Sequence, residues 1–337
     1  MTFQTEPHIP NNRDNFFQFG HTAWDRKELL DEPTPEWPST LKGLSKVERA
    51  KLKKERIART KNMHPIWTPD MEAAHDEMEE TLSLRGSGSP ECFGLLGPEY
   101  GGKTQIIQRF VDTFHCDNTT GRPYEDRPLT GDDMPNVPVV WLPPDNTTKQ
   151  LMESFLAFYG IYLGGRPNAG QISREVMKQA RQHQTQIVVM DDIHNLRGKN
   201  SAMDLKVMYE KLGQVMFLFT TITEDCPAFD MMHGGNQTLE RTVWQNIEAP
   251  IVGSEEWHEV LGAFGEAMPW CMSDLTQLID HSDLIHERTG GKTAKLAFLL
   301  RRMTAKMIRQ NTDGEDEITA ELIKSVKMTN FSDDIAA

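Results

Sequence analysis

One segment constrains the fold of this 337-residue chain more than any other: Gly97-Pro98-Glu99-Tyr100-Gly101-Gly102-Lys103-Thr104. It follows the apolar run Cys92–Leu96 and begins a pattern typical of an amphipathic helix, Lys103–Phe114. Glycine suits such a turn because a Cβ atom would keep the backbone away from a bound anion. Backbone N–H groups of a loop with this spacing converge on phosphate, and the positive end of the following helix adds to the attraction. The segment therefore predicts a phosphate-binding loop between a strand and a helix.

The residues of this loop have distinct expected roles toward a nucleotide. Lys103 would neutralise the β- and γ-phosphates of ATP, and the Thr104 hydroxyl would ligate Mg²⁺. The predicted nucleotide contacts are Gly97, Pro98, Glu99, Tyr100, Gly101, Gly102, Lys103, Thr104 and Gln105. We therefore expect an ATP·Mg²⁺ site here, with a glycine-rich turn that binds nothing as the alternative.

A second apolar run, Ile187–Met190, ends in two carboxylates, Asp191 and Asp192. We expect Asp191 to hold the Mg²⁺ through water, and Asp192 to polarise the water that attacks the γ-phosphate. A strand that simply exits into a turn would give the same residues. The order along the chain favours the functional interpretation, because one predicted strand and two predicted helices separate Lys103 from this run.

The central part of the chain alternates short β-rich runs with helical stretches. The predicted strands are Cys92–Leu96, Val137–Leu142, Ile187–Met190, Val215–Thr220 and Trp244–Ala249. The predicted helices between them are Lys103–Phe114, Thr147–Tyr159, Gln171–Gln182 and Ala202–Leu212. Strands spaced by helices predict an α/β fold in which a mostly parallel sheet is flanked by helices.

After about Pro250 the strands stop and only helical patterns follow. These predicted helices are Glu255–Glu266, Asp274–Gln277, Leu284–Thr289, Lys292–Arg309 and Thr319–Met328. The chain is therefore expected to have four parts. They are an extended N-terminal arm at 1–40, a helical extension and linker at 41–90, the nucleotide-binding core at 91–250 and an all-α lid at 251–337.

The N-terminal arm is rich in Pro, Asn, Asp and Glu and carries scattered aromatic residues. Two interpretations are open: a disordered tail, or an arm that docks on a neighbouring molecule through its aromatic side chains. The helix that follows begins at the capping-box pattern Ser45-x-x-Glu48 and extends to about Lys61, and a second helix is predicted at Pro69–Leu84.

The charge of the chain is unevenly spread. The net charge is −14, yet residues 42–61 carry nine Lys and Arg against two Glu, which leaves +7 in this stretch and −21 in the remainder. The four cysteines are too far apart for a zinc site or a disulfide framework. No signal-peptide pattern and no apolar run of about 20 residues is visible. We expect a cytoplasmic protein with no membrane partner.

The order of these motifs resembles the AAA+ ATPases of the TniB/TnsC group, which regulate target choice in DNA transposition and are related to the Mu phage target-binding ATPase. The resemblance covers about residues 60–325. Besides the phosphate loop, it rests on the segments Met190–Leu196, Phe217–Thr221, Gln237–Arg241, Leu261–Trp270 and Thr289–Leu296. It implies an AAA+ core with a helical lid that uses ATP and Mg²⁺.

The resemblance also assigns three further roles. Thr221, at the end of a predicted strand, would be the sensor-1 residue, and the adjacent Thr220 fits the same role. Arg241 would reach the nucleotide of a neighbouring subunit, with an ordinary surface ion pair as the alternative. Lys295 would be the sensor-2 residue, where the family has Arg. Asp192 stands where the family usually has Glu, so slow hydrolysis is expected.

Two groups of basic residues are candidates for contact with DNA. The first recurs at helical spacing and could follow a phosphate backbone, although solvated helix faces are often equally basic. It consists of Lys46, Arg49, Lys53 and Arg56. The second lies in helix starts and loops of the core and consists of Lys149, Arg174, Lys178, Arg197 and Lys199. Nothing indicates base-specific reading, so non-specific binding is expected.

Taken together, the motifs and the resemblance predict an ATP-dependent regulator of DNA transposition. It would bind duplex DNA, assemble with ATP into a homo-oligomeric ring or filament, and recruit or activate a transposase together with a target-selection protein. Hydrolysis would drive disassembly. The main alternative is a defence or signalling ATPase whose oligomerisation is gated by nucleotide without DNA. A P-loop kinase or small-molecule NTPase and a clamp- or helicase-loader protein are further alternatives.

Overall fold

The computed structural model describes residues 19, 22–25, 27–28, 41, 43–61, 66–84, 92–119, 137–142, 147–196, 201–212, 215–223, 240–268, 271, 276–310 and 316–328. The chain divides into two compact units. The first comprises Met1–Asp31, Ala73–Gly97 and Lys103–Asn246, and the second comprises Glu32–Glu72, Pro98–Gly102 and Ile247–Ala337.

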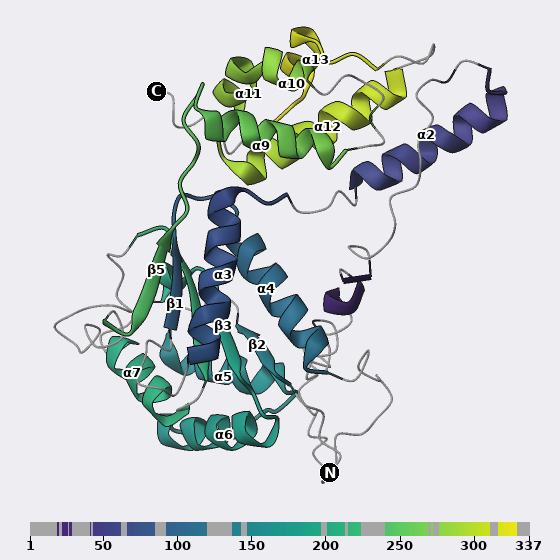
Figure 1. Ribbon diagram of the computed structural model, residues 1–337. Helices are drawn as coiled ribbons and strands as arrows, with labels where there is room; N and C mark the ends of the chain where they lie inside the picture. Colours follow the sequence, from purple (N-terminus) through teal and green to yellow (C-terminus); the bar gives the residue numbers. More distant parts are fainter. Residues whose placement is uncertain are drawn as a thin grey trace. The chain divides into compact units, whose positions relative to one another are not determined.

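The first unit is built on a five-stranded sheet in which all neighbouring strands are parallel (Figure 1). Its strands are β1 (Cys92–Leu96), β2 (Val139–Leu142), β3 (Ile187–Met190), β4 (Met216–Thr221) and β5 (Thr242–Asn246), in the order β2-β3-β4-β1-β5. Every residue of β3 and β4 is buried, which explains their nearly continuous apolar sequences. Because the strands are parallel, the segments after β1, β3 and β4 all leave the sheet on the side where the strands have their carboxyl ends. We call this side the carboxyl edge of the sheet, and the opposite side the amino edge.

Helices flank this sheet. They are α4 (Lys103–Asp117), α5 (Thr148–Phe158), α6 (Ala169–Gln182), α7 (Ser201–Leu212), most of α3 (Pro69–Leu84) and the short 3₁₀ helix η2 (Ile193–Asn195). Local side chains fix two of the starts. The Thr147 hydroxyl accepts a hydrogen bond from the Gln150 N–H at the start of α5. Asn168 and Gln171 form a reciprocal capping box at the start of α6.

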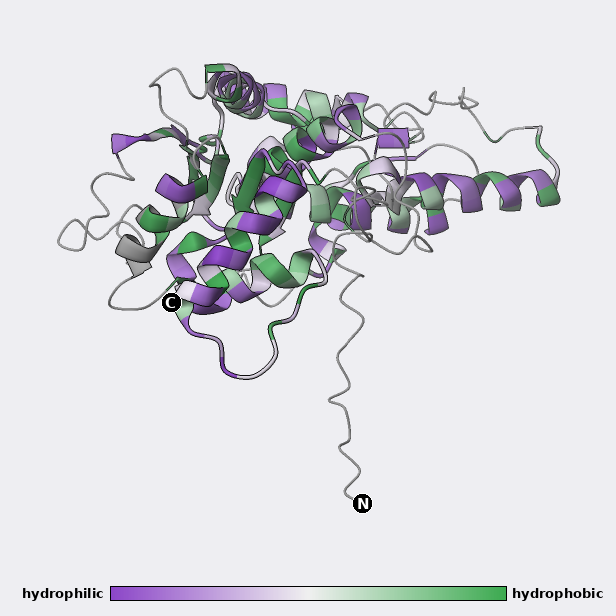
Figure 2. Ribbon diagram, turned by 90° about the horizontal axis from the view of Figure 1, so that it is seen from below, coloured by the Kyte–Doolittle hydropathy of each residue, from purple (hydrophilic) through white to green (hydrophobic). Residues whose placement is uncertain are grey.

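The described elements of the second unit are all helices. They are α2 (Lys46–Lys61), α9 (Glu255–Glu266), α10 (Gln277–Asp280), α11 (Ser282–Thr289), α12 (Thr293–Gln310) and α13 (Ala320–Ser325). Trp257 is fully buried in their core, and its indole N–H donates to the Ser282 carbonyl at 3.3 Å. Helix α2 packs against α12, and Ile57 contacts the same core. Figure 2 shows that α2 is otherwise mostly hydrophilic, as expected of a helix that buries a narrow face.

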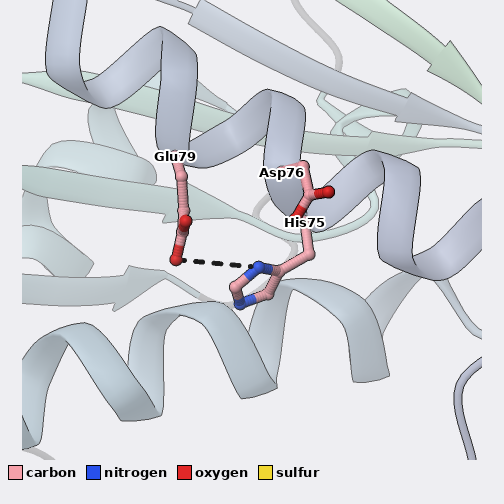
Figure 3. A group of neighbouring side chains, drawn as sticks. All are labelled: His75, Asp76 and Glu79. Carbon is pink, nitrogen blue, oxygen red and sulfur yellow. Dashed lines mark ion pairs between the residues drawn. The ribbon is translucent and has the colours of Figure 1, made fainter.

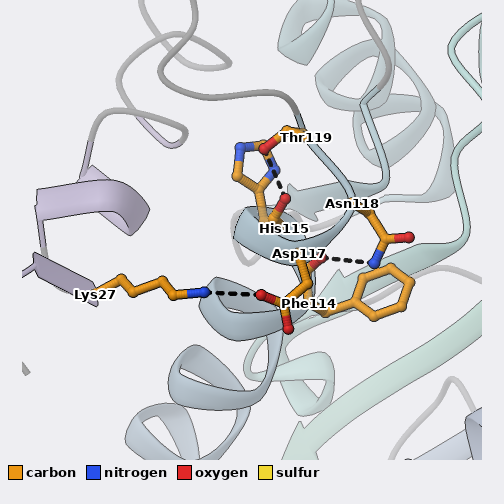
Figure 4. Close-up of polar contacts among 6 residues, drawn as sticks. All are labelled: Lys27, Phe114, His115, Asp117, Asn118 and Thr119. Carbon is orange, nitrogen blue, oxygen red and sulfur yellow. Dashed lines mark hydrogen bonds and ion pairs between the residues drawn. The ribbon is translucent and has the colours of Figure 1, made fainter. Parts of the chain in front are cut away.

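A described piece of the N-terminal arm lies against α4 in the first unit. The Phe19 ring packs edge-on against the His115 imidazole, with centroids 5.4 Å apart, and also contacts Phe158. The Lys27 ammonium donates to Asp117 Oδ1 at 2.8 Å (Figure 4). Burial lowers the pKa of His115 to about 4, so the imidazole beneath Phe19 is neutral at ordinary pH. The described part of the arm therefore docks on its own chain, whereas the sequence left open a disordered tail or docking on a neighbouring molecule.

The predicted fold class is confirmed, with a parallel sheet, flanking helices and helical extensions. The bounds of β3, α3 and α9 are those predicted from sequence. The last strand occupies Thr242–Asn246 rather than Trp244–Ala249. The four-part division stays a prediction, although the structure groups residues 32–72 with the C-terminal helices. No helix among the described residues is both long and apolar enough to cross a membrane.

Candidate nucleotide site

The phosphate loop leaves β1 at the carboxyl edge of the sheet. The Gly97 N–H donates to the Thr221 carbonyl at 3.3 Å, which ties the start of the loop to the end of β4. The Lys103 ammonium donates to the Gly97 carbonyl at 2.7 Å, and the residue is only 6% exposed. A buried ammonium needs polar partners, and the loop supplies one. The Lys103 ammonium is therefore held at the loop, and the side chain does not extend into water.

The middle of the loop, Pro98–Gly102, has an unusual backbone. Tyr100 has a φ of 65° and Gly102 a φ of 97°, both in the left-handed region. The Gly101 N–H donates to the Pro98 carbonyl at 3.2 Å, which closes a tight turn. A Cβ at Gly102 would stand 2.5 Å from Cε of Met71. Gly102 is thus required by its backbone conformation, and the flexible end of Met71 packs into the space that a Cβ would occupy.

Two hard oxygen donors meet after β1 and β3. The Thr104 hydroxyl lies 3.3 Å from each carboxylate oxygen of Asp191. Hydroxyl and carboxylate oxygens are the ligands that Mg²⁺ prefers in proteins. The residues present therefore fit the magnesium ion that was predicted for Thr104 and Asp191.

The electrostatic surroundings of Asp191 also favour a cation. Burial raises the pKa of the Asp191 carboxyl, and the neighbouring charge of Asp192 raises it further. Hydrogen bonds from the Thr220 and Thr104 hydroxyls act in the opposite direction. A carboxylate destabilised by burial and by a second negative charge is one that a bound metal ion would stabilise.

Asp192 immediately precedes the 3₁₀ helix η2 and has a left-handed conformation, with φ 51° and ψ 47°. Few non-glycine residues adopt this conformation, and those that do cluster at functional sites. Its N–H donates to the Thr220 hydroxyl at 2.7 Å, and the same hydroxyl donates to Asp191. One side chain of β4 therefore holds the Asp191 carboxylate and the backbone of Asp192.

Thr220, rather than Thr221, is the residue that contacts the Asp191 carboxylate. The Thr221 hydroxyl instead donates to the Thr223 carbonyl at 2.6 Å and accepts from the Thr223 N–H. The strand register explains the difference, because Met190 lies opposite Phe219 and so places Asp191 near Thr220. The sequence alone offered both hydroxyls, and only the pairing of β3 with β4 distinguishes them.

Arg241 immediately precedes β5, and its carbonyl accepts from the Cys92 N–H at the start of β1. It is exposed and lies at the amino edge of the sheet, opposite the phosphate loop. A strand of this length separates the two edges by roughly 13 Å, at about 3.3 Å per residue. Within its own chain Arg241 is therefore far from the carboxylates. The preceding Gln237–Leu239 lie outside the described residues.

Lys295 lies near the start of α12 in the second unit. Its ammonium stands 5.6 Å from the centroid of the Tyr100 ring, a cation–π arrangement. Burial and the nearby charge of Lys292 lower the pKa of Lys295, and the charge of Glu99 opposes them. The structure thus brings the predicted sensor-2 residue to the phosphate loop.

The basic residues of α2 have different surroundings from one another. Lys46 is exposed and Lys53 is half-buried. Arg49 donates through Nε to the Leu44 carbonyl at 2.9 Å. Arg56 is fully buried in an ion pair with Asp316, so its prediction as a DNA contact was wrong. Its guanidinium joins α2 to the lid.

Helix α6 carries a row of exposed cations. Arg174, Lys178 and Arg181 recur at helical spacing, and Lys211 of α7 lies beside them around a hollow of about 740 Å³. Lys178 also pairs with Glu175 at 3.3 Å. This row stands out in a chain with a net charge of −14.

Two neighbouring hollows extend the row toward α5. One of about 550 Å³ shares Arg174 and adds Arg166, and one of about 450 Å³ shares Arg166 and adds Lys149. Lys149 pairs with Glu153 at 3.6 Å. We call the six cations of these hollows the basic track. They are Lys149, Arg166, Arg174, Lys178, Arg181 and Lys211. Arg197 and Lys199, also considered for DNA contact, lie outside the described residues.

A further polar cluster lies on α3, where His75, Asp76 and Glu79 bring their donor atoms within 4.8 Å of one another (Figure 3). His75 Nδ1 stands 3.8 Å from Glu79, one helical turn away. The imidazole ring packs edge-on against Phe110. Asp76 and Glu79 are both exposed. The contacts are those of an ordinary surface pair on one helix turn.

Comparison with known proteins agrees with this architecture. Residues 56–216 match the model of a family described as Bacterial TniB protein. A comparison with curated proteins gives no match. Among solved structures, Cdc6p from Pyrobaculum aerophilum is 13% identical, with a TM-score of 0.53 over 73% of this chain. The ORC1 protein of Aeropyrum pernix, solved in complex with DNA, is 16% identical, with a TM-score of 0.55 over 77%. This chain covers only 64% and 65% of those two chains.

The strand order, the phosphate loop after β1 and the carboxylates after β3 define the class of protein: the chain has the AAA+ P-loop fold. The resemblance to TniB-type AAA+ ATPases is confirmed over residues 56–216. That range runs from within α2 to the first residue of β4 and includes the phosphate loop, both carboxylates and α6. At these identities the solved structures support the fold alone.

Proposed function

We propose that this chain is an ATPase that binds ATP·Mg²⁺ at residues 97–105 and uses hydrolysis to time its assembly on duplex DNA during transposition. The observation that carries the proposal is the meeting of Lys103, Thr104 and Asp191 at the carboxyl edge of the sheet. A cation for the phosphates and oxygen ligands for a metal ion are the minimum for nucleotide chemistry, and both are present.

Each residue would act through contacts that the structure supports. Lys103 would exchange the Gly97 carbonyl for phosphate oxygens. Thr104 and Asp191 would hold the Mg²⁺, which neutralises phosphate charge when it is bound. Asp192 would orient the attacking water, with its backbone fixed by the hydrogen bond to Thr220. The aspartate side chain is one methylene shorter than glutamate, so we expect slow turnover.

Completion of the site would require a second copy of the chain. Arg241 lies at the opposite sheet edge from the carboxylates of its own chain. An arginine supplied by a neighbouring subunit can contribute about 10³–10⁵ in rate. A ring or filament of identical subunits would place the Arg241 of each one at the nucleotide of the next.

Duplex DNA is the proposed template for this assembly. The basic track offers five cations on α5, α6 and α7 and a sixth, Arg166, in the loop before α6, and a row of cations is suited to a phosphate backbone. Helix α6 has 14 residues, or about 21 Å at 1.5 Å per residue, enough to follow several phosphates. The ORC1 structure with a similar fold was solved with DNA, which agrees with this proposal. A transposase and a target-selection protein are the partners that the TniB resemblance suggests.

The nucleotide site is tested by Lys103→Ala. A charge-assisted contact contributes about 1.5–3 kcal/mol, so ATP affinity should fall roughly 10- to 150-fold. Titration with a fluorescent ATP analogue measures the change. Unaltered affinity in this variant would show that the nucleotide binds elsewhere.

Assembly is tested by light scattering with duplex DNA in the presence of ATP, ADP or a non-hydrolysable ATP analogue. Large particles that require both DNA and a triphosphate would support the transposition role. Particles that form with ATP regardless of DNA would instead support the defence or signalling ATPase. A monomer in every nucleotide state would favour a small-molecule NTPase.

A further inference from the structure

Tyr100 occupies an unusual place in the phosphate loop. It is a bulky residue with a φ of 65°, and its side chain is 41% exposed. A large side chain in the left-handed region is strained, and such strain persists only where neighbouring contacts hold it. Glycine would adopt the same backbone without strain. The aromatic ring at this position therefore calls for a physical reason.

Two contacts join Tyr100 to the start of α12. Its carbonyl accepts a hydrogen bond from the Ala294 N–H at 3.0 Å. Its ring lies beneath the Lys295 ammonium, 5.6 Å from the ring centroid. The backbone and the side chain of one loop residue therefore bind two consecutive residues of the lid helix.

The start of α12 is an unfavourable place for a cation. The helix begins at Thr293, so Lys295 lies in its first turn, where the helix dipole is positive. Lys292 adds a second positive charge nearby. The negative face of the Tyr100 ring and the carboxylate of Glu99 are the described groups that offset this repulsion. Positive charge concentrated at the phosphate loop in this way is suited to an anion.

We propose that Tyr100 is a positioning residue that holds Lys295 at the phosphate loop, so that its ammonium meets the triphosphate of a bound nucleotide. This inference rests on the proposed ATP site. Lysine is a point charge on a flexible stem and lacks the planar fork by which an arginine orients itself. An external surface must therefore fix its direction, and the Tyr100 ring is that surface.

The ring, and not the hydroxyl, makes the contact with Lys295, which gives a matched series of variants. Tyr100→Phe keeps the ring and removes the hydroxyl. Tyr100→Leu keeps an apolar side chain that is not branched at Cβ and removes the ring. Tyr162→Leu removes an equally exposed tyrosine that lies outside the loop, at 43% exposure. Lys295→Met removes the charge that the ring is proposed to hold.

The test measures the affinity of each full-length variant for fluorescent ATP and ADP analogues, without DNA. A cation–π contact of about 0.5–2 kcal/mol corresponds to a loss of roughly 2- to 30-fold in ATP affinity for Tyr100→Leu. We expect Tyr100→Phe to recover most of that loss, and Tyr162→Leu to bind as the wild type does. The loss should be greater for ATP than for ADP, since the additional phosphate is the expected partner of Lys295.

The double variant Tyr100→Leu/Lys295→Met decides whether the two residues act together. We expect it to be no weaker than Lys295→Met alone, because the ring has nothing to position once the ammonium is gone. Additive losses, or equal losses for Tyr100→Phe and Tyr100→Leu, would overturn the inference. Wild-type protein that binds no ATP would refute the nucleotide site itself. Wild-type protein that binds ATP while Tyr100→Leu is unaffected would refute only the role of Tyr100.

Discussion

Thr220→Val tests how the Asp191 carboxylate and the Asp192 backbone are held at the site. Valine keeps the shape of threonine but removes the hydroxyl that donates to Asp191 and accepts from the Asp192 N–H. A hydrogen bond to a charged group contributes about 1.5–3 kcal/mol. If this contribution is fully expressed in the transition state, kcat should fall roughly 10- to 150-fold, at about 1.36 kcal/mol per factor of ten.

The same substitution has a predicted effect on pH dependence. Burial raises the pKa of Asp191, whereas the hydrogen bond from Thr220 lowers it. Without that hydrogen bond the pKa of Asp191 rises further. Mg²⁺ binding requires the ionised carboxylate, so activity is lost as the pH falls through this pKa. The acid limb of Mg²⁺-dependent hydrolysis should therefore lie at higher pH in Thr220→Val than in the wild-type protein.

Phosphate release at saturating ATP, measured across pH at several Mg²⁺ concentrations, gives both kcat and the pH of the acid limb. Thr221→Val is the matched control, because the Thr221 hydroxyl contacts only Thr223 in the described hydrogen bonds. We expect that variant to lose less activity and to keep the wild-type acid limb. A larger loss in Thr221→Val, or an unshifted acid limb in Thr220→Val, would show that the strand register does not identify the working hydroxyl.

Three further perturbations follow from the structure. Asp316→Ala should destabilise the second unit by about 3–5 kcal/mol in urea unfolding, because it leaves Arg56 buried without its carboxylate partner. We expect the double variant Arg56→Met/Asp316→Leu to recover that stability. Arg241→Ala should bind ATP normally yet lose assembly-linked phosphate release, and full hydrolysis in the assembled variant would exclude a role in trans. Arg174→Glu/Lys178→Glu should weaken DNA binding and lower its salt dependence, whereas Arg309→Glu, an exposed lid cation, should do neither.

Much of the fold could be predicted because its signals are local. The buried strand Ile187–Met190 reads as an apolar run, and Pro69–Leu84 and Glu255–Glu266 carry helix formers between clear boundaries. The last strand was misplaced because β5 is an edge strand whose residues are mostly half-buried. Such a strand gives a weak apolar pattern, and its bounds come from pairing with β1.

In the candidate site, too, the residues with local signals could be predicted and those with long-range contacts could not. The phosphate loop and Asp191 could be predicted because a contiguous motif carries them. Arg56 could not, since the carboxylate that buries it lies 260 residues further along the chain. A basic helix read by itself gives every cation the same expected exposure. The contact between Tyr100 and Lys295 could not be predicted from the spacing of residues either, because it joins the phosphate loop to the lid.

The strand arrangement also relates hydrolysis to assembly. The phosphate loop and the carboxylates leave the sheet at its carboxyl edge, whereas Arg241 enters β5 at the amino edge. A parallel sheet cannot bring these two edges together within one chain, because each strand crosses it only once. If Arg241 acts on a nucleotide, that nucleotide belongs to another copy. A mixture of Arg241→Ala and Lys103→Ala chains would then recover hydrolysis that neither variant shows alone, since each supplies what the other lacks. No recovery in co-assembled particles would assign Arg241 to a structural role at the surface.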